Sequence, residues 1–332
     1  RSSDLILNWN GKQLLEQFLP SVVQFSKEAT VYVADNASTD DSVAFINAHF
    51  PEVSIVVNST NTGYAGGYNE ALQHIDADIY ALVNSDIEVT ENWLQPIIKT
   101  FQADPTTAII QPKILDFKNK AYFEYAGAAG GYIDQYGYPF CRGRLFDTLE
   151  KDNGQYDTNQ EIFWASGACF FIRSQVYNEL NGFDTSFFAH QEEIDLCWRA
   201  KNKGYTIKYL FESKVYHVGG ATLQQGNPKK TELNFRNSLL MLTKNLPQKD
   251  LYRVLFIRMV LDGIAGIQFL LQGKIKHLLA ILKAHIAFYS RFSEIYVKRS
   301  NFQQPKYYIT KSIVCSYFIK KIRFFNDLIR IK

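Results

Sequence analysis

The chain of 332 residues is long enough for two domains, or for one large domain with an appendage. Its composition, 46% hydrophobic and 21% charged, is that of an ordinary globular protein and not of a disordered or fibrous chain. The four cysteines show neither C-x-x-C spacing nor a partnered histidine pattern. This argues against a disulfide framework or a zinc site and favours free thiols in a reducing compartment.

Strand and helix patterns alternate through the first hundred residues. Strands are predicted at Leu5–Asn8, Thr30–Ala34, Val53–Val57 and Ile79–Val83, and helices at Lys12–Phe25, Asp41–Phe50, Tyr64–Ile75 and Glu91–Phe101. The alternation predicts an α/β fold with a mostly parallel sheet covered on both faces. The first strand is short, so we expect the natural strand to be longer, with the N-terminus trimmed or altered.

The pattern loosens from about Pro105 to Asp157, where Gly, Tyr and Phe dominate. Irregular ligand-facing loops or a short hairpin fit this composition, and the stretch Tyr122–Phe140 is expected to shape an acceptor site. Strands are predicted again within Phe163–Arg173 and near Thr206–Leu210. Beyond Lys230 the chain is predicted to be helical to its end.

Acidic and amide side chains follow the predicted strands. In parallel sheets ligands bind beyond the carboxyl ends of the strands, where Asn8, Asp35 and Asp86 fall. A carboxylate such as Asp86 is well placed to hold Mg²⁺ or Mn²⁺ together with substrate phosphates. The glycines around Gly66 and Gly67 would let backbone approach a ligand, but their spacing and position argue against a dinucleotide fold. Loop acids and turn glycines are the alternative interpretation of each feature alone.

The stretch Gly182–Tyr205 places Glu192 and Glu193 in the first turn of a predicted helix with one buried face. The helix dipole there favours an ionised carboxylate, which suits a general base. Ordinary helix-start acids with an Asp195–Arg199 pair are the alternative. His217 follows a strand-like run; it is either structural or completes a metal or diphosphate site.

Together these motifs resemble a family 2 glycosyltransferase of the GT-A fold, close to bacterial rhamnosyltransferase-like members. The matching segments occur in the family's order and are Leu7–Gly11, Asp35–Asp40, Asn61–Asn69, Leu82–Asp86, Gly182–Asp184, Glu192–Arg199 and Val215–His217. The resemblance implies transfer of a sugar from a nucleotide diphospho-sugar with inversion at the anomeric carbon. The donor it suggests is dTDP-rhamnose or a UDP-hexose.

The resemblance also implies roles for single residues. Glu193 matches the catalytic acid of the family, with Glu192 beside it, and Asp35 should contact the nucleobase. Asp86 matches the last acid of the D-x-D motif and would bind a divalent metal, Mg²⁺ or Mn²⁺, with help from His217. The expected substrate-binding residues are Asn8, Asp35, Asn36, Gly66, Gly67, Asn69, Asn84 and Trp198. Two positions depart from the family: Asn84 replaces the first acid of D-x-D, and the base is Glu where Asp is commoner.

The C-terminal part of the chain differs in charge from the rest. Residues Leu251–Lys332 hold 15 Lys or Arg and 3 Asp or Glu, a net charge of +12, whereas residues 1–250 carry −9. The longest uncharged run, Gly263–Gly273, is too short to span a bilayer. Helices that lie in an anionic membrane interface fit this composition, and a soluble helical cap is the alternative. Nucleic acid is not expected as a partner, since no binding motif accompanies the charge.

These observations predict three parts. Residues 1–105 form the nucleotide-sugar-binding half of a GT-A domain, 106–225 the acceptor-binding and catalytic half, and 226–332 a basic amphipathic helical region. The expected protein is an inverting glycosyltransferase of cell-surface polysaccharide synthesis that uses a saccharide or lipid-linked acceptor. It is expected in the cytoplasm, without a signal peptide, peripheral on the inner face of the cytoplasmic membrane. A membrane-bound scaffold protein that binds sugar nucleotides but has lost catalysis is the alternative, supported by Asn84.

Overall fold

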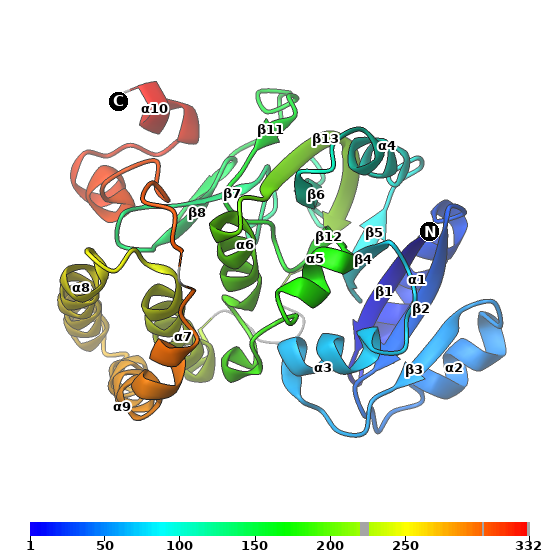
Figure 1. The fold of residues 1–332 in the computed structure, drawn as a ribbon, viewed down its shortest axis with the longest axis horizontal. Coiled ribbons are helices and arrows are strands. Elements are labelled where there is room, and N and C mark those ends of the chain that lie inside the picture. The colour runs from blue at the N-terminus through cyan, green and yellow to red at the C-terminus, as the bar shows by residue number, and fades with distance from the viewer. Residues whose placement is uncertain (220–225, 301, 331–332) are drawn as a thin grey trace.

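A computed structural model describes residues 1–219, 226–300 and 302–330. Its centre is a nine-stranded mixed sheet in the order β11-β13-β6-β12-β4-β1-β2-β3, with β5 paired to β13 (Figure 1). Its strands are β1 (Ser2–Asn8), β2 (Ala29–Asp35), β3 (Ser54–Val57), β4 (Ile79–Asn84), β5 (Ile87–Val89), β6 (Thr107–Asp116), β11 (Gln160–Glu161), β12 (Cys169–Arg173) and β13 (Thr206–His217). A second sheet has four short strands, β7 (Gly131–Ile133), β8 (Pro139–Cys141), β9 (Arg144–Leu145) and β10 (Thr148–Leu149).

The first half is the predicted parallel α/β unit. Strands β3, β2, β1 and β4 are parallel neighbours. Successive residues such as Leu5 and Ile6 belong to apolar clusters on opposite faces of the sheet, because side chains alternate along a strand. The helices of this half are α1 (Lys12–Phe25), α2 (Ser42–His49), α3 (Gly63–Leu72) and α4 (Gln95–Ala103).

The second half extends the same sheet with mixed strand directions. Strand β12 is antiparallel to both β4 and β6, while β13 runs parallel to β6. The two strand signals at Thr206–Leu210 and Val215–His217 belong to one strand, β13, interrupted by an irregularity between Leu210 and Lys214. Helices α5 (Ser174–Glu179) and α6 (Glu192–Asn202) and the short turn η1 (Thr185–Phe187) complete this half.

The C-terminal region contains α7 (Pro228–Asn245), α8 (Leu251–Leu271), α9 (Ile275–Val297), the turn η2 (Cys315–Ile319) and α10 (Phe325–Arg330). The prediction of helix to the end of the chain is wrong for residues 302–312, which are not helical. There the backbone bonds to β7 and the residues after it: the Ile309 N–H donates to the Ile133 carbonyl and the Gln135 N–H to the Thr310 carbonyl. These bonds replace those of a helix, so this segment joins the second sheet to the C-terminal region.

Helix α8 is, among the described helices, long and apolar enough by length and composition to cross a membrane. The sequence argument counted uninterrupted apolar runs and therefore missed this property. Two of the three charges in α8 face the protein: Arg258 and Asp262 are buried and paired at 2.9 Å, and Asp262 also contacts His285 of α9. The third, Arg253, is exposed in the first turn and pairs with Asp250.

Candidate active site

Asn8 and Asp35 end the neighbouring strands β1 and β2 and lie opposite each other in the parallel register. Asn8 Nδ2 donates to Asp35 Oδ1 at 3.1 Å, and the backbone N–H of Ser38 donates to Asp35 Oδ2 at 2.9 Å. Both side chains are buried, and Asn8 Oδ1 has no hydrogen-bond partner within the described part of the chain. The structure thus brings two predicted donor-site residues together, with one acceptor atom unused.

Asn36 links β2 to the segment that leads into α3. Its Nδ2 donates to Asn61 Oδ1 at 3.0 Å and to the Gly63 carbonyl at 3.2 Å, while its Oδ1 accepts from Asn58 Nδ2 at 3.1 Å. The side chain is buried, and its polar atoms bond to protein. Asn36 therefore shapes the loop at this edge of the sheet.

The glycines of α3 serve helix packing. A Cβ at Gly67 would lie 2.9 Å from Leu7 Cδ1, and one at Gly66 would lie 2.5 Å from Cβ and Oγ1 of Thr62. Real side chains do not approach this closely, so Gly67 is needed for α3 to sit against β1, and Gly66 leaves room for the Thr62 side chain at the start of the same helix. This differs from the expectation that Gly66 and Gly67 admit the backbone to a ligand.

Asp86, which follows β4, lies beside His217 at the end of β13. Asp86 Oδ1 is 3.1 Å from His217 Nε2, and His217 Nδ1 is 3.3 Å from Glu124 Oε1. Burial favours the neutral acid, but the hydrogen bond and charge of His217 outweigh it and lower the pKa of Asp86. Burial likewise opposes protonation of His217, yet the two carboxylates raise its pKa to about 10. The three buried side chains form an acid–imidazole–acid array.

Asp86 Oδ1 and His217 Nε2 could serve as two ligands of a divalent metal only where the metal replaces the proton that this array holds, because a metal-bound imidazole nitrogen carries no proton. An octahedral ion with bonds of about 2.1 Å has neighbouring ligand atoms about 3 Å apart, close to the separation of Asp86 Oδ1 and His217 Nε2. Glu124 on the far nitrogen is the partner that commonly orients a metal-binding histidine. No group of three or more His, Cys, Asp or Glu side chains is arranged around a common metal position in the described residues. The remaining ligands would have to be phosphate oxygens and water, as is usual for Mg²⁺.

Glu192 and Glu193 begin α6, as predicted. Glu192 is buried and Glu193 is partly exposed. Each has an Oε2 atom that is buried without a hydrogen-bond partner among the described residues. A Cβ added to Gly167 would lie 3.7 Å from the Glu193 Cβ, and the next residue, Ala168, accepts a hydrogen bond from the Asn84 N–H at 2.9 Å. Glu193 therefore lies near the carboxyl end of β4.

The expectation that the helix dipole keeps these acids ionised is wrong for an identifiable reason. Burial raises the pKa of both carboxyls, and the charge of Glu193 raises that of Glu192 further. Backbone N–H groups at the start of α6 oppose the shift of Glu193 but do not cancel it. Glu193 is the more exposed of the two acids.

The segment before α6 has a constrained backbone. Phe188, His190 and Gln191 have φ angles of 64°, 71° and 74°, values that cost non-glycine residues free energy. Asn237 of α7 holds this segment, because its Nδ2 lies 2.7–2.9 Å from the carbonyl oxygens of Phe187, Ala189 and His190. The run that precedes Glu192 and Glu193 is therefore held in place by the C-terminal region.

Asp195 anchors the other side of α6. It pairs with Arg199 at 2.7 Å, the pair given as the alternative interpretation of this helix start, and with Lys244 of α7 at 3.0 Å. Lys244 also pairs at 2.8 Å with Asp184, which precedes η1, and the side chains of Asp184, Asp195 and Lys244 are at most 7% exposed. Residues Asn237, Lys244 and Glu124 were not predicted from sequence, since each acts through a partner distant in the chain.

Two expected substrate-binding residues pack or bond within the protein, and a third, Asn84, lies where the sequence places it. Trp198 is fully buried, with its ring centroid 5.3 Å from that of Phe163, so the prediction that it contacts substrate is wrong. Asn69 bonds through both of its polar atoms to Phe183 and Tyr177 and so supports the Gly182–Asp184 turn. Asn84 is half-buried at the end of β4, two residues before Asp86.

The fold and the family match together define a glycosyltransferase of the GT-A type. The glycosyl transferase family 2 domain matches residues 5–181, more than half of the chain, and the protein belongs to this family.

Two curated relatives illustrate its similarity to named transferases. It is 22% identical over 218 residues to the N-acetylglucosaminyl-diphospho-decaprenol L-rhamnosyltransferase of Mycobacterium tuberculosis, covering 61% of this chain and 71% of the relative. It is 20% identical over 286 residues to the low-salt glycan biosynthesis hexosyltransferase Agl10 of Haloferax volcanii, covering 83% and 87%. Both relatives are named as transferases, so they lend no support to the scaffold alternative.

Solved structures agree on the fold. GalNAc-T7 with UDP, GalNAc and Mn²⁺ superposes with a TM-score of 0.58 at 15% identity, over 74% of this chain and 48% of that chain. TarS 1-349 of S. aureus in complex with UDP-GlcNAc gives 0.55 at 12% identity, over 90% of both chains. At these identities the likeness establishes the fold and not the substrates.

Proposed function

We propose that this glycosyltransferase transfers a sugar, with inversion, from a nucleotide diphospho-sugar to a saccharide or lipid-linked saccharide. The observation that carries the proposal is the Glu192–Glu193 pair, whose buried, partner-free oxygens lie near the carboxyl end of β4. The names of the relatives favour dTDP-rhamnose or a UDP-hexose as donor and a role in cell-surface polysaccharide synthesis.

In this mechanism Glu193 accepts the proton of the acceptor hydroxyl as its oxygen attacks the anomeric carbon from the face opposite the diphosphate. A carboxylate whose pKa is raised toward neutrality is a better base than an ordinary glutamate. Glu192 stays protonated beside it, so the pair carries one negative charge instead of two. Asn8 and Asp35 are assigned to the nucleoside side of the donor.

Asp86 and His217 would hold Mg²⁺ or Mn²⁺, and Glu124 would orient His217. When bound, the ion supplies positive charge that stabilises the leaving diphosphate. The structures of GalNAc-T7 with Mn²⁺ and UDP support the proposal of a divalent metal. Asn84 occupies the position of the first acid of D-x-D, which leaves Asp86 as the one carboxylate ligand of this motif.

The test is transfer from dTDP-rhamnose, UDP-glucose and UDP-N-acetylglucosamine to a polyprenyl-diphosphate-linked sugar, with product configuration determined by NMR. The variant Glu193→Gln should lower kcat by about 10²- to 10⁴-fold, the usual contribution of a general base. Glu91→Gln is the matched control, since Glu91 is exposed and lies outside the site. Near-normal transfer by a folded Glu193→Gln protein would show that Glu193 is not the base.

We also propose that α8 and α9 rest on an anionic membrane surface on the cytoplasmic side. Their outward faces carry apolar side chains at helical spacing, and these side chains are 48–84% exposed: Tyr252, Phe256, Val260, Ile264, Ile267, Leu270, Leu271, Ile275, Leu279, Leu282, Ile286 and Tyr289. Exposed Lys274, Lys276 and Lys283 lie along the same pair of helices. Apolar and basic residues together are typical of interfacial helices.

Flotation with vesicles tests this proposal. The full-length protein should float with phosphatidylglycerol vesicles and much less with phosphatidylcholine vesicles. The double variant Ile264→Ser/Ile286→Ser should bind the anionic vesicles at least tenfold more weakly. Val57→Ser is the control, because Val57 is an equally exposed apolar residue on β3. Equal flotation of the double variant and the control would exclude these helices as the contact surface.

A further inference from the structure

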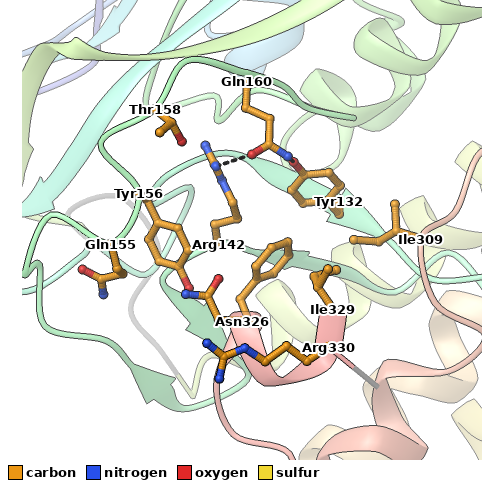
Figure 2. A pocket seen from close by; sticks show the side chains of 11 residues that line it. Tyr132, Arg142, Gln155, Tyr156, Thr158, Gln160, Ile309, Asn326, Ile329 and Arg330 are labelled. Carbon is orange, nitrogen blue, oxygen red and sulfur yellow. Dashed lines mark hydrogen bonds between the residues drawn. The ribbon is translucent and has the colours of Figure 1, made fainter. Parts of the chain in front are cut away.

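A cavity of about 520 Å³ lies between the second sheet, the segment that leads to β11, and α10. This volume is in the range of small-molecule sites. Figure 2 shows its lining: Tyr132, Arg142, Gln155, Tyr156, Thr158, Gln160, Ile309, Phe325, Asn326, Ile329 and Arg330. None of these described lining residues is acidic, and two are arginines.

Arg142 is the central feature of this cavity. Its side chain is 3% exposed, its Nε donates to the Ala129 carbonyl at 2.8 Å, and its Nη1 donates to Gln160 Oε1 at 2.6 Å. Its Nη2 is buried without a hydrogen-bond partner in the part of the chain that the structure describes. Burial lowers the pKa of Arg142. A buried guanidinium with an unused donor costs free energy unless an acceptor is supplied.

The neighbours of Arg142 fix its orientation. Its Cζ lies 5.4 Å from the ring centroid of Tyr156 and 4.7 Å from that of Tyr209. Gln160, which accepts from Arg142, donates in turn to Tyr132 Oη at 3.0 Å. The guanidinium is therefore held by bonds and ring faces, and the free Nη2 is not a disordered surface group.

The remaining lining combines aromatic faces with amides. Tyr132 and Tyr156 lie on either side of Arg142 in Figure 2, with Asn326 and Arg330 of α10 across from them. Phe325 lies 5.3 Å from Tyr132 between ring centroids. Aromatic rings pack against the C–H faces of sugars, amides bond to hydroxyls, and the remaining Nη2 of Arg142 can donate to a carboxylate or phosphate.

The cavity is separate from the candidate active site. Its lining includes none of the residues assigned there, and α10 lies on the opposite side of the molecule from α2 and α3 (Figure 1). Phe325 is fixed by its backbone N–H, which donates to Glu150 Oε1 at 3.3 Å, so α10 closes one wall of the cavity. The proposed transfer reaction uses no part of this wall.

We propose that this cavity binds an anionic sugar, a uronate or a sugar phosphate, with its acidic group on Arg142, its ring among Tyr132, Tyr156 and Phe325, and Asn326 and Arg330 of α10 on the opposite wall. The site recognises the anion and the sugar together. The cavity shares no residue with the proposed donor site or with Glu193, so a test of this site does not depend on the proposed transfer reaction.

The test is calorimetric titration of the full-length protein, in phosphate-free buffer, with glucuronate, glucose 6-phosphate, glucose and inorganic phosphate. Glucuronate or glucose 6-phosphate should bind at least tenfold more tightly than either glucose or phosphate alone. Saturating UDP, dTDP or GDP should leave this binding unchanged. Displacement by a nucleotide would place the anion in the donor site and overturn the proposal, as would equal binding of glucose or of phosphate.

Variants locate the site. Arg142→Gln should weaken binding roughly tenfold or more, as expected for the loss of a charge-assisted hydrogen bond. Because Arg142 is buried, its replacement could unfold the protein, so Arg330→Ala and Asn326→Ala on the exposed side of α10 provide a second measurement. Each should weaken binding severalfold. Lys320→Ala, which removes an exposed positive charge outside the cavity, is the control. Unchanged binding in folded Arg142→Gln or Arg330→Ala proteins would refute the site.

Discussion

The buried side chain of Asp4 leads to a prediction about how the free energy of unfolding depends on pH. Asp4 lies in the middle of β1, between β2 and β4, is fully buried, and neither of its oxygens has a hydrogen-bond partner among the described residues. Burial raises its pKa from the ordinary 3.8 to about 7. Such a carboxyl binds its proton more tightly in the folded chain than in the unfolded chain.

The sign of the effect on stability follows from this difference. Between pH 3.8 and about 7 the folded state holds the proton that the unfolded state has lost, so the free energy of unfolding falls as the pH rises. The penalty is absent below pH 3.8 and complete above about 7, where it reaches about 4 kcal/mol. That is a large part of the 5–15 kcal/mol that typically stabilises a domain.

Replacing Asp4 with Asn removes the charge and keeps the shape. We expect Asp4→Asn to match the parent protein near pH 4 and to exceed it at higher pH, with the gain growing by about 3 kcal/mol between pH 5 and pH 8. Urea unfolding, followed by tryptophan fluorescence at pH 5 and at pH 8, measures the free energy of unfolding of both proteins. The prediction concerns the difference between Asp4→Asn and the parent protein at each pH. A gain of the same size at pH 5 and pH 8 would refute the argument that ionisation of Asp4 is the cause.

Three further predictions concern the site. Lys244→Met should lower the free energy of unfolding, measured in urea, by about 3–5 kcal/mol, because it leaves Asp184 and Asp195 buried without their shared cation. Lys229→Met, which removes a cation from an exposed pair, is the control and should lower it by less than about 1 kcal/mol. Asn237→Ala should lower kcat at least tenfold and stability by about 1–3 kcal/mol, and an unaltered kcat would show that the segment before α6 does not need this support. Chelator should abolish transfer, and Asp86→Asn should raise the Mn²⁺ concentration needed to restore it by about tenfold or more; transfer that persists in chelator would contradict a metal at Asp86.

Local patterns account for what the sequence predicted well. Helix α1 has the bounds that its apolar spacing predicts, and the parallel strands β1 to β4 follow from their β-branched, apolar runs. Asn8, Asp35 and Asp86 could be placed at one edge because the carboxyl ends of parallel strands share an edge. These features depend on neighbours within a few residues or on general rules of sheet topology.

Pairings between distant segments were not predictable in the same way. Lys244 lies 49 residues after Asp195. Glu124 and His217 are likewise far apart in the sequence, on segments that only the folded sheet brings together. No sequence spacing therefore predicts either pair. Trp198 occurs in a motif that matches the family, yet the side of α6 that it occupies faces the core. The pKa direction of Glu192 and Glu193 also depended on three-dimensional burial, which outweighs the favourable position at a helix start.

The C-terminal helices connect the proposed membrane surface to the catalytic segment. Helix α7 supplies Asn237 and Lys244 to the segment around α6, and α9 reaches the same segment through Arg291, which donates to the Ser186 carbonyl at 3.1 Å, and Lys298, which pairs with Asp184 at 3.0 Å. The opposite faces of α8 and α9 carry the exposed apolar side chains. Helix α9, which we propose rests on the bilayer, thus bonds directly through Arg291 to the backbone that precedes Glu192 and Glu193. If α8 and α9 bind a membrane as proposed, their contacts would hold Glu192 and Glu193, the proposed catalytic acids, in a fixed orientation toward a lipid-linked acceptor.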